Sequence, residues 1–264
     1  MNDERRTMNG EEKKTTSPPV LVLDVGGTHV KMLATGQTDR REIATGPAYT
    51  PEQFVHDVAP TTADWKYDAI SIGIPGPVLG GRIVANPPNL GPGWVGFDFE
   101  KALGKPVKVI NDAALQALGS YEGGKMLFLG LGTGLGSAMV VSSPGGGGIV
   151  EPMELGHLPY RKRTFEDYVG ERGLERFGKK KWRRLVADVV ERFQKALEPD
   201  YIVLGGGNAR KLKTLPENCR LGDNEHAFEG GFRLWQEQSP VAPGQRHELD
   251  KAMTEGKVHE GATK

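Results

Sequence analysis

The sequence has little cysteine, no long apolar run and no excess of charge of one sign. Cys219 is its one cysteine, which excludes an intramolecular disulfide and a cysteine-cluster zinc site. No apolar run reaches the roughly 18 residues of a membrane span, and the first residues, Met-Asn-Asp-Glu-Arg-Arg, do not resemble a signal peptide. Lys plus Arg and Asp plus Glu number 34 each, which removes the global electrostatic case for nucleic acid or an acidic membrane. We therefore expect a cytoplasmic protein with a small-molecule partner, no nucleic acid and no membrane.

Glycine is the residue in excess, with 37 among 264 residues, about twice the average usage. The glycines gather at the ends of apolar runs, which indicates loops that approach a ligand closely rather than a disordered tract. Residues 1–17 and 239–264 are polar, and we expect both to be disordered tails. The first tail is too short for a helix-turn-helix domain.

A first glycine turn follows a buried strand at Val20–Val25 and leads into a second strand that ends at Leu33. Gly26, Gly27 and Thr28 would expose backbone N–H groups and a hydroxyl to a phosphate. A Gly-Gly hairpin without any ligand is an equally open interpretation. Asp24 is harder to explain without a ligand, because an acid within an apolar strand is costly unless it is paired or solvated. A Mg²⁺-bound water would supply such a partner.

The pattern is repeated 107 residues later, measured from Gly27 to Gly134. The strand Lys125–Leu131 leads into the glycine-rich turn Gly130–Gly136, and Ser137–Val141 is the expected hairpin partner. The repeat predicts two similar lobes whose phosphate turns face each other across a cleft. A third element, Asp200–Gly207, ends a strand on three glycines and has room for an extended group.

Asn111 and Asp112 stand where a strand from Val107 passes into a helix that ends near Gly119. A carboxylate at the end of a buried strand lies where open α/β sheets place their ligands. Two interpretations of Asp112 stay open from this stretch alone: it caps the helix, or it acts as a catalytic base.

Other segments carry further polar groups. Gly76 lies in a rigid Pro-Gly-Pro turn, and Asn89 lies in the Pro-rich stretch Ile83–Trp94, which we expect to be a fixed loop. A non-helical segment follows the flexible link Pro144–Gly148 and contains Glu154 and His157, although His157 alone is more simply an ordinary loop histidine. The remaining expected elements are strands at Arg40–Ala44, Ala69–Ile74 and around Arg220, helices at Pro51–Val58, Phe99–Leu103 and Ala227–Trp235, a helical region from Glu166, and the basic run Lys179–Arg184 that leads into an amphipathic helix.

Taken in order, these motifs resemble the ROK family (repressors, open reading frames and sugar kinases) of the actin-like ATPase superfamily. The resemblance covers Pro19 to about Gln238 and rests on Asp24-x-Gly-Gly-Thr-x-x-Lys31, Ile110-Asn-Asp-Ala, Gly130-x-Gly-Thr-Gly-x-Gly136, Glu154-x-Gly-His157 and Leu204-Gly-Gly-Gly207. It implies an α/β fold of two ribonuclease-H-like lobes with the sugar and the phosphate donor between them. The implied division is 18–113 for the N-terminal lobe, 114–224 for the C-terminal lobe, and 225–238 for a helix that returns to the first lobe.

The resemblance also implies roles for individual residues. Asp112 would be the base on the sugar hydroxyl, and the other sugar ligands would be Gly76, Asn89, Asn111, Glu154, His157 and Glu166. Asp24 would hold Mg²⁺ through water. The phosphate donor would lie against Asp24, Gly26, Gly27, Thr28, Lys31, Gly132, Thr133, Gly134, Gly136, Gly205, Gly206 and Gly207.

One departure from the family is informative. Many members carry a cysteine-rich zinc motif after the Gly-His pair, whereas this chain has no cysteine between residues 157 and 218, so we expect no zinc. The absence of that motif and the basic residues Lys179, Lys180, Lys181 and Arg183, a possible polyphosphate patch, most resemble the polyphosphate glucokinase branch.

The expected protein is a homodimeric sugar kinase that transfers a phosphoryl group from polyphosphate or ATP, with Mg²⁺, to the 6-hydroxyl of a hexose such as glucose. Two alternatives stay open: a kinase for fructose, mannose or an N-acetylhexosamine, and a non-catalytic sugar-binding regulator. The basic run itself is more often simply a solvated helix face.

Overall fold

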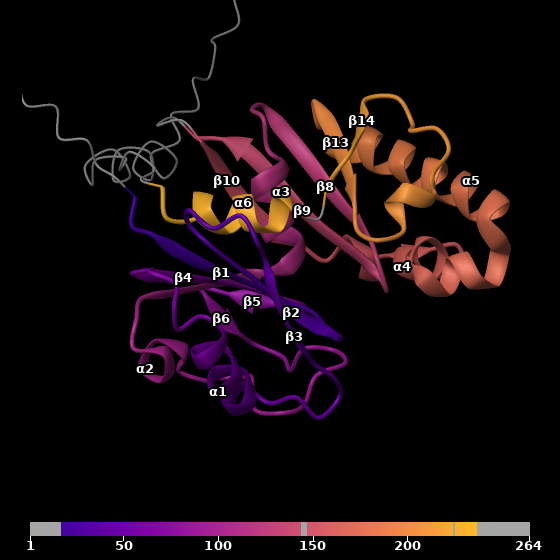
Figure 1. Ribbon diagram of the computed structural model, residues 1–264. Helices are drawn as coiled ribbons and strands as arrows, with labels where there is room; N and C mark the ends of the chain where they lie inside the picture. Colours follow the sequence, from indigo (N-terminus) through magenta and orange to yellow (C-terminus); the bar gives the residue numbers. More distant parts are fainter. Residues whose placement is uncertain (1–16, 144–146, 224, 237–264) are drawn as a thin grey trace, which may run out of the picture.

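The computed structural model describes residues 17–143, 147–223 and 225–236. Two five-stranded sheets follow one another along the chain (Figure 1), with strand orders β3-β2-β1-β4-β7 and β10-β9-β8-β13-β14. Apart from residue 17, the predicted tails at 1–17 and 239–264 lie outside the described residues. None of the helices within the described ranges combines the length and the apolar character that a membrane crossing requires.

The first sheet is built around a buried apolar strand, β1, which pairs antiparallel with β2 and parallel with β4. All six residues of β4 are buried, as expected for a central strand covered on both faces. The predictions for β1, β4 and the strand from Val107 are confirmed, and the third strand begins one residue later than predicted. The strands are β1 (Val20–Val25), β2 (His29–Ala34), β3 (Arg41–Ala44), β4 (Ala69–Ile74) and β7 (Val107–Asn111).

The second sheet repeats the antiparallel hairpin and adds an edge strand that the sequence analysis missed. Its strands are β8 (Lys125–Leu131), β9 (Leu135–Ser142), β10 (Gly148–Met153), β13 (Tyr201–Gly205) and β14 (Cys219–Leu221).

The prediction of a flexible link over Pro144–Gly148 is wrong at Gly148, which starts β10, while residues 144–146 lie outside the described part. The prediction of a non-helical segment after it is also incomplete, because β10 pairs with β9 and a 3-10 turn follows at Leu155–His157. Pro152 obscured this strand in the sequence, yet an edge strand tolerates proline because one side has no ladder partner.

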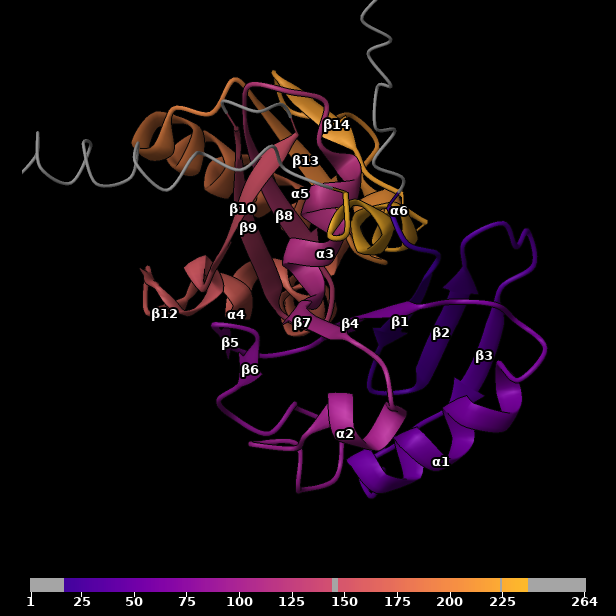
Figure 2. The ribbon, with the colours of Figure 1, turned by 90° about the vertical axis from the view of Figure 1, so that its left-hand side faces the viewer.

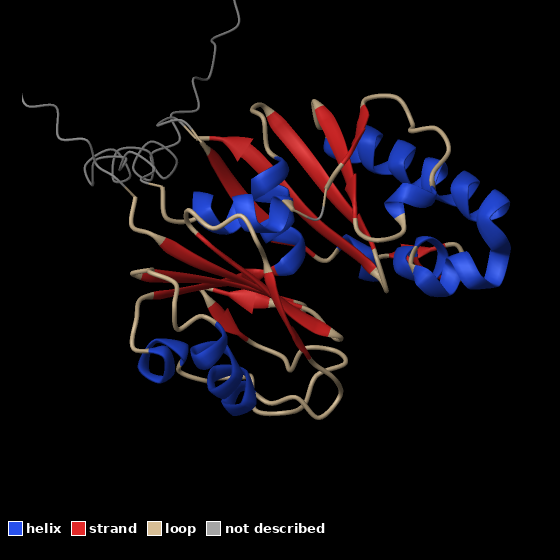
Figure 3. Cartoon of the chain, viewed as in Figure 1, coloured by secondary structure: helices blue, strands red, loops and turns tan. Residues whose placement is uncertain are grey.

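The helices are arranged in layers around the two sheets (Figure 3). Buried side chains of α1 and α2 join the core on one face of the first sheet, α3 and α6 lie between the sheets, and α4 and α5 cover the far side of the second sheet. Short hairpins are formed by β5 (Val78–Leu79) with β6 (Arg82–Ile83), and by β11 (Pro159–Tyr160) with β12 (Arg163–Thr164). The helices are α1 (Pro51–Thr61), α2 (Phe99–Leu103), α3 (Asp112–Ser120), α4 (Phe165–Val169), α5 (Glu171–Leu197) and α6 (His226–Arg233), with a 3-10 turn at Ala209–Lys211.

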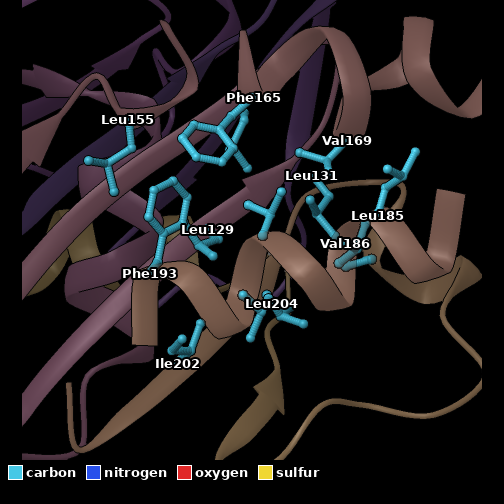
Figure 4. Close-up of a cluster of buried hydrophobic side chains, with 14 of the residues drawn as sticks. Leu129, Leu131, Leu155, Phe165, Val169, Leu185, Val186, Phe193, Ile202 and Leu204 are labelled. Carbon is cyan, nitrogen blue, oxygen red and sulfur yellow. The ribbon is translucent and has the colours of Figure 1, made fainter. Parts of the chain in front are cut away.

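The core between the second sheet and α5 is a continuous apolar cluster (Figure 4). Leu129, Leu131 and Leu204 of the sheet face Val186 and Phe193 of the helix. Helix α5 bends at Gly178, which has φ 69° and ψ 160° and stands immediately before the basic run. The run therefore opens a second, straight helical segment whose apolar face is fixed in this core.

Helices α3 and α6 cross closely because glycines stand at their contact. A Cβ on Gly119 would lie 1.8 Å from the His226 carbonyl oxygen, and a Cβ on Gly230 would lie 1.9 Å from that of Leu115. Gly231 is packed closely against β1, because a Cβ on it would lie 2.3 Å from the Val22 side chain. Helix α6 also packs on β1 and β4, so it ties the first sheet to the helix that begins at Asp112.

Candidate active site

The junction of β7 and α3 separates the two roles that the sequence left open for Asp112. Asn111, not Asp112, is the N-cap of α3, because its Oδ1 accepts from the backbone N–H groups of Ala113 (2.9 Å) and Ala114 (3.2 Å). Its Nδ2 donates to the carbonyl oxygen of Gly76 at 2.9 Å, which fixes the Pro-Gly-Pro turn beside the helix. The interpretation of Asp112 as the N-cap residue is therefore wrong, although its Oδ1 also accepts from the Ala113 N–H of the first helical turn.

Asp112 is the first residue of α3, which leads from β7 towards the second sheet (Figure 2). Burial raises the pKa of Asp112, and a hydrogen bond from the Ala113 N–H (2.8 Å) partly offsets this, while the nearby Glu154 carboxylate raises it further. Burial also raises the pKa of Asp24 to about 6, and Asp112 adds to that rise while Lys31 opposes it. The two acids thus lie close enough to influence each other.

Three of the predicted sugar ligands lie together. The Nδ1 atom of His157 lies 3.6 Å from Oε2 of Glu154, and its Nε2 atom lies 3.9 Å from Oε2 of Glu166. These side chains come from the 3-10 turn and from α4, and they are partly open to solvent. Since the Glu154 carboxylate also acts on Asp112, the cluster and the candidate base belong to one site.

The first glycine turn is held by one threonine at the end of β3. The Thr45 hydroxyl donates to the carbonyl oxygen of Gly26 at 2.8 Å, and its N–H donates to that of Thr28, also at 2.8 Å. The Gly26 N–H is used within the hairpin, where it donates to His29. Within residues 17–143 and the other described ranges, no acceptor is recorded for the N–H groups of Gly27 and Thr28.

Asn89 lies directly against this turn. A Cβ on Gly27 would lie 3.0 Å from the Cβ of Asn89, which has a left-handed φ of 66°. The loop predicted to contact the sugar is therefore joined to the turn predicted to hold phosphate. Lys31 faces Asp24 across β1 and β2 in register, at the base of the same turn.

The second glycine turn contacts both the candidate base and the sugar cluster. A Cβ on Gly136 would lie 2.9 Å from the Cβ of Ala113, next to Asp112, and a Cβ on Gly134 would lie 2.5 Å from Oε2 of Glu166. The N–H of Gly132 donates within the turn, to Gly130 and Gly134. Over the described chain, the amides of this turn without a recorded acceptor are those of Thr133 and Gly134.

The three glycines after β13 have different surroundings. A Cβ on Gly205 would press on the ring of Phe128, at 2.5 Å, so this glycine is required by core packing. Gly206 has a left-handed φ of 78°, and a Cβ on it would lie 2.6 Å from the Leu131 carbonyl oxygen. Gly207 has open space around it. The triglycine segment therefore abuts the second glycine turn and opens outward at its last residue.

The sequence analysis missed the residue that follows the triglycine segment. Asn208 is 3% exposed and donates from Nδ2 to the Gly132 carbonyl oxygen (3.2 Å) and to Oε2 of Glu171 (3.1 Å). An amide side chain placed immediately after a glycine-rich strand end was the available signal. Thr45 was missed as well, because a threonine after a strand is too common to stand out.

The predicted basic patch lies on α5 after its bend. Lys179, Lys180 and Lys181 are exposed, and the Nζ atom of Lys181 lies 4.7 Å from the centre of the Phe177 ring. The Nε atom of Arg183 donates to the carbonyl oxygen of Lys211 at 2.7 Å. Because Lys211 in turn contacts Asn208, the patch is linked to the second glycine turn through two residues.

The side chains around the candidate site can be compared with those that Mg²⁺ prefers as ligands. The described residues contain no group of three or more His, Cys, Asp and Glu side chains that could enclose a metal. Mg²⁺ is commonly bound through one or two carboxylates, waters and the phosphates of a substrate rather than by an all-protein cage. Asp24 and Asp112 fit that mode of binding.

A cavity of about 790 Å³ lies elsewhere, along β7 and the β5–β6 hairpin. Its walls include Arg82, Phe97, Lys108 and Leu234, and none of the predicted site residues lines it. The candidate site is therefore defined by the convergence of side chains and glycine turns around Asp112 and not by this cavity.

Comparison with known proteins agrees with this arrangement. Polyphosphate glucokinase from Mycobacterium tuberculosis is 27% identical over 218 residues, which covers 75% of this chain and 80% of that protein. The bifunctional enzyme NanE/NanK from Brucella melitensis is 27% identical over 245 residues, but the match covers only 47% of its length.

Among solved structures, the inorganic polyphosphate/ATP-glucomannokinase from Arthrobacter sp. strain KM superimposes with a TM-score of 0.68 at 24% identity, covering 82% of this chain and 97% of that one. This confirms the expected α/β fold. The model of the ROK family matches residues 20–177, more than half of the chain. The chain therefore belongs to the ROK family.

Proposed function

We propose that this protein is a sugar kinase that transfers a phosphoryl group from polyphosphate or ATP to the 6-hydroxyl of a hexose, with glucose as the first candidate. The observation that carries the proposal is the position of Asp112. Asp112 is not the N-cap of its helix, its pKa is raised, and it is near Glu154 of the proposed sugar cluster, near Asp24 and next to Ala113, which contacts the second glycine turn. The similarity to polyphosphate glucokinase supports this choice of reaction.

Asp112 would accept the proton of the sugar hydroxyl as that oxygen attacks the terminal phosphorus. A carboxylate whose pKa is raised binds this proton more favourably than an ordinary aspartate, and general-base action contributes roughly 10²–10⁴-fold. Asn111 would donate its second amide hydrogen to the sugar, because the first is held by Gly76. Glu154, His157 and Glu166 would bind further hydroxyls, with Gly76 and Asn89 completing the sugar site.

Phosphoryl transfer depends mainly on in-line positioning and on neutralisation of the phosphate charge. The amides of Gly27, Thr28, Thr133 and Gly134, which have no acceptor among the described residues, would bind the donor from both turns, as backbone nests do for other anions. When bound, Mg²⁺ would neutralise part of the phosphate charge, and Asp24 would hold it through water. The remaining glycines of the two turns, Lys31 and Gly205–Gly207 complete the proposed donor site.

The choice of donor follows from the basic patch. Polyphosphate is a chain of repeated negative charge, so a row of exposed cations that leads to the phosphate turn favours it over a shorter donor. Lys179, Lys180 and Lys181 begin such a row, and Arg183 and Lys211 continue it to Asn208. We therefore propose polyphosphate as a donor beside ATP.

The test is a coupled assay of glucose 6-phosphate formation with ATP and with polyphosphate side by side, each with and without Mg²⁺. We expect turnover with both donors that depends on Mg²⁺. The absence of turnover with either donor on any hexose would reject the kinase and favour a sugar-binding regulator.

A second candidate substrate is an N-acetylhexosamine or another hexose, and the similarity to NanE/NanK is the observation that favours it. The hydroxyl-binding groups of the cluster do not by themselves distinguish these sugars. A panel of glucose, mannose, fructose and N-acetylmannosamine, compared by kcat/KM, decides between them.

A further inference from the structure

Three successive backbone carbonyls of the second glycine turn, those of Leu131, Gly132 and Thr133, accept from Asn208 and Glu171. The Leu131 oxygen accepts from the Asn208 N–H (2.9 Å), and the Gly132 oxygen accepts from the Glu171 N–H (3.0 Å) and from Asn208 Nδ2 (3.2 Å). The Thr133 oxygen accepts from the Glu171 N–H at 3.2 Å. Two residues that are distant in the sequence therefore fix three successive peptide units.

A carbonyl that is held in place also fixes the direction of the N–H in the same peptide unit, because a trans peptide unit is planar and its C=O and N–H point in opposite directions. The Gly132 carbonyl belongs to the same unit as the Thr133 N–H, and the Thr133 carbonyl to the same unit as the Gly134 N–H. Holding these two oxygens therefore directs these two N–H groups to the opposite side. No residue in the described ranges accepts a hydrogen bond from either of these two N–H groups.

The Asn208 side chain is itself fixed in orientation. Its Oδ1 accepts from Lys211 Nζ at 2.5 Å, and its Nδ2 donates to Gly132 and to Glu171. A carboxamide reversed about its last bond would place an oxygen against two acceptors, so this network determines the assignment. Because Asn208 is only 3% exposed, water cannot readily replace these hydrogen bonds.

We propose that Asn208 is a positioning residue for the phosphoryl donor, and that its side chain holds the Gly132 peptide so that the Thr133 amide faces the donor phosphates, while the Glu171 N–H holds the next peptide and with it the Gly134 amide. This inference rests on the proposed function, since it assumes that the turn binds phosphate. It goes beyond the proposed function by assigning part of the turn's orientation to one buried carboxamide, which acts together with the Glu171 N–H and is itself held by Lys211.

Asn208→Ala removes the bond to Gly132, and Asn208→Asp keeps the bond from Lys211 but places an oxygen against Gly132 and Glu171. The matched control is Ser71→Ala, which removes another fully buried side chain that bonds a backbone carbonyl, in the first sheet. Binding of sodium tripolyphosphate and of a non-hydrolysable ATP analogue is measured by calorimetry, together with glucose binding and the KM for each substrate.

We expect both Asn208 variants to weaken donor binding about tenfold and to raise the donor KM, with glucose binding unchanged, as follows from the loss of one buried hydrogen bond. Ser71→Ala should lower stability without affecting the donor. If Asn208→Ala does not fold, Lys211→Met, at a partly exposed side chain, should give a smaller change in the same direction.

Donor binding that falls no more in the Asn208 variants than in Ser71→Ala overturns the inference, and so does an equal loss of donor and glucose binding. Wild-type protein that phosphorylates sugar while the variants behave like the control leaves the proposed function standing and rejects only the role of Asn208. Wild-type protein that neither binds a donor nor turns over rejects both.

Discussion

The two glycine turns have the same local form and are held in different ways. Each joins an antiparallel pair of strands at the centre of a sheet, and each leaves two amides without an acceptor in the described residues. Thr45, which lies 19 residues beyond Gly26 in the chain, holds the first turn with two bonds. The second is held by Asn208 and Glu171, which lie well beyond it in the chain.

The turns also differ in the acid that accompanies them. Asp24 lies within the strand that enters the first turn, whereas the strand that enters the second, β8, contains no acid. The second turn instead contacts the helix end that bears Asp112, through Gly136 and Ala113. A repeated sequence pattern thus gives a repeated shape, while the chemistry is divided between the two copies.

The strongest test of this division is Asp112→Asn, because Asp112 is the acid beside the second turn and the proposed base. We expect kcat to fall by about 10²–10⁴-fold with sugar binding still measurable, since Asn cannot accept the proton. The contrasting variant is Asn111→Ala, which should lose about 1–2 kcal/mol of stability because it removes the cap. Stability by urea unfolding and turnover by the coupled assay separate the two. Near-normal turnover in Asp112→Asn would contradict its role as the base.

Asp24→Asn should have opposite effects on activity and on stability. Activity should fall on the order of 10²-fold, because the proposed water-mediated hold on Mg²⁺ is lost and metal ions supply several kcal/mol of charge stabilisation. Wild-type stability should change with pH, because the pKa of Asp24 is raised from 3.8 to about 6 in the folded protein. The folded state then holds the proton more tightly than the unfolded state, so this contribution is present below about pH 4 and is lost as the pH rises through 6.

At pH 8 we therefore expect Asp24→Asn to be more stable than the wild type by about 1–3 kcal/mol, and at pH 4 we expect no difference. Urea unfolding of both proteins at the two pH values measures this change. A variant that is less stable than the wild type at pH 8 would show that the Asp24 carboxylate is stabilised by its neighbours instead of strained by burial.

Much of the fold could be predicted because its central strands are predominantly apolar runs that end at glycine or proline turns. Val20–Val25, Ala69–Ile74 and Lys125–Leu131 are strands with the predicted bounds. The edge strand β10 could not be identified, because Pro152 and its mixed polarity resemble a loop and only pairing with β9 makes it a strand.

Prediction of the candidate site from the sequence was limited in the same way, by contacts between distant segments. The glycine motifs and Asn111-Asp112 could be identified because each occupies a few consecutive residues. The capping role of Asn111, the packing role of Gly205 and the position of Asn208 depend on contacts between distant segments. A local pattern contains no information about such contacts.

Removal of charge from the basic patch tests whether the second turn receives polyphosphate, because the patch is linked to that turn through Arg183, Lys211 and Asn208. In a variant with Lys179, Lys180 and Lys181 replaced by Gln, we expect the KM for polyphosphate to rise about tenfold and the KM for ATP to change little. High salt should reduce the difference, since exposed charges are screened. The control is the same replacement at three other exposed lysines, Lys66, Lys101 and Lys195. Equal loss with both donors would reject the guidance of polyphosphate by this patch.

The smallest expected effect is that of Thr45→Val, the counterpart in the first turn of the Asn208 variants. Valine has nearly the same shape and keeps the N–H bond to Thr28, so only the hydroxyl bond to Gly26 is lost. Thr45 is partly exposed, and water can replace that hydroxyl, whereas Asn208 is buried. We therefore expect the donor KM to rise only about two- to threefold. Thr35→Val, another threonine whose hydroxyl bonds the backbone of β1, is the control. A change in donor KM as large as that of Asn208→Ala would show that the first turn depends on its side-chain hydrogen bond as strongly as the second turn does. Burial of the side chain would then not determine how important its hydrogen bond is.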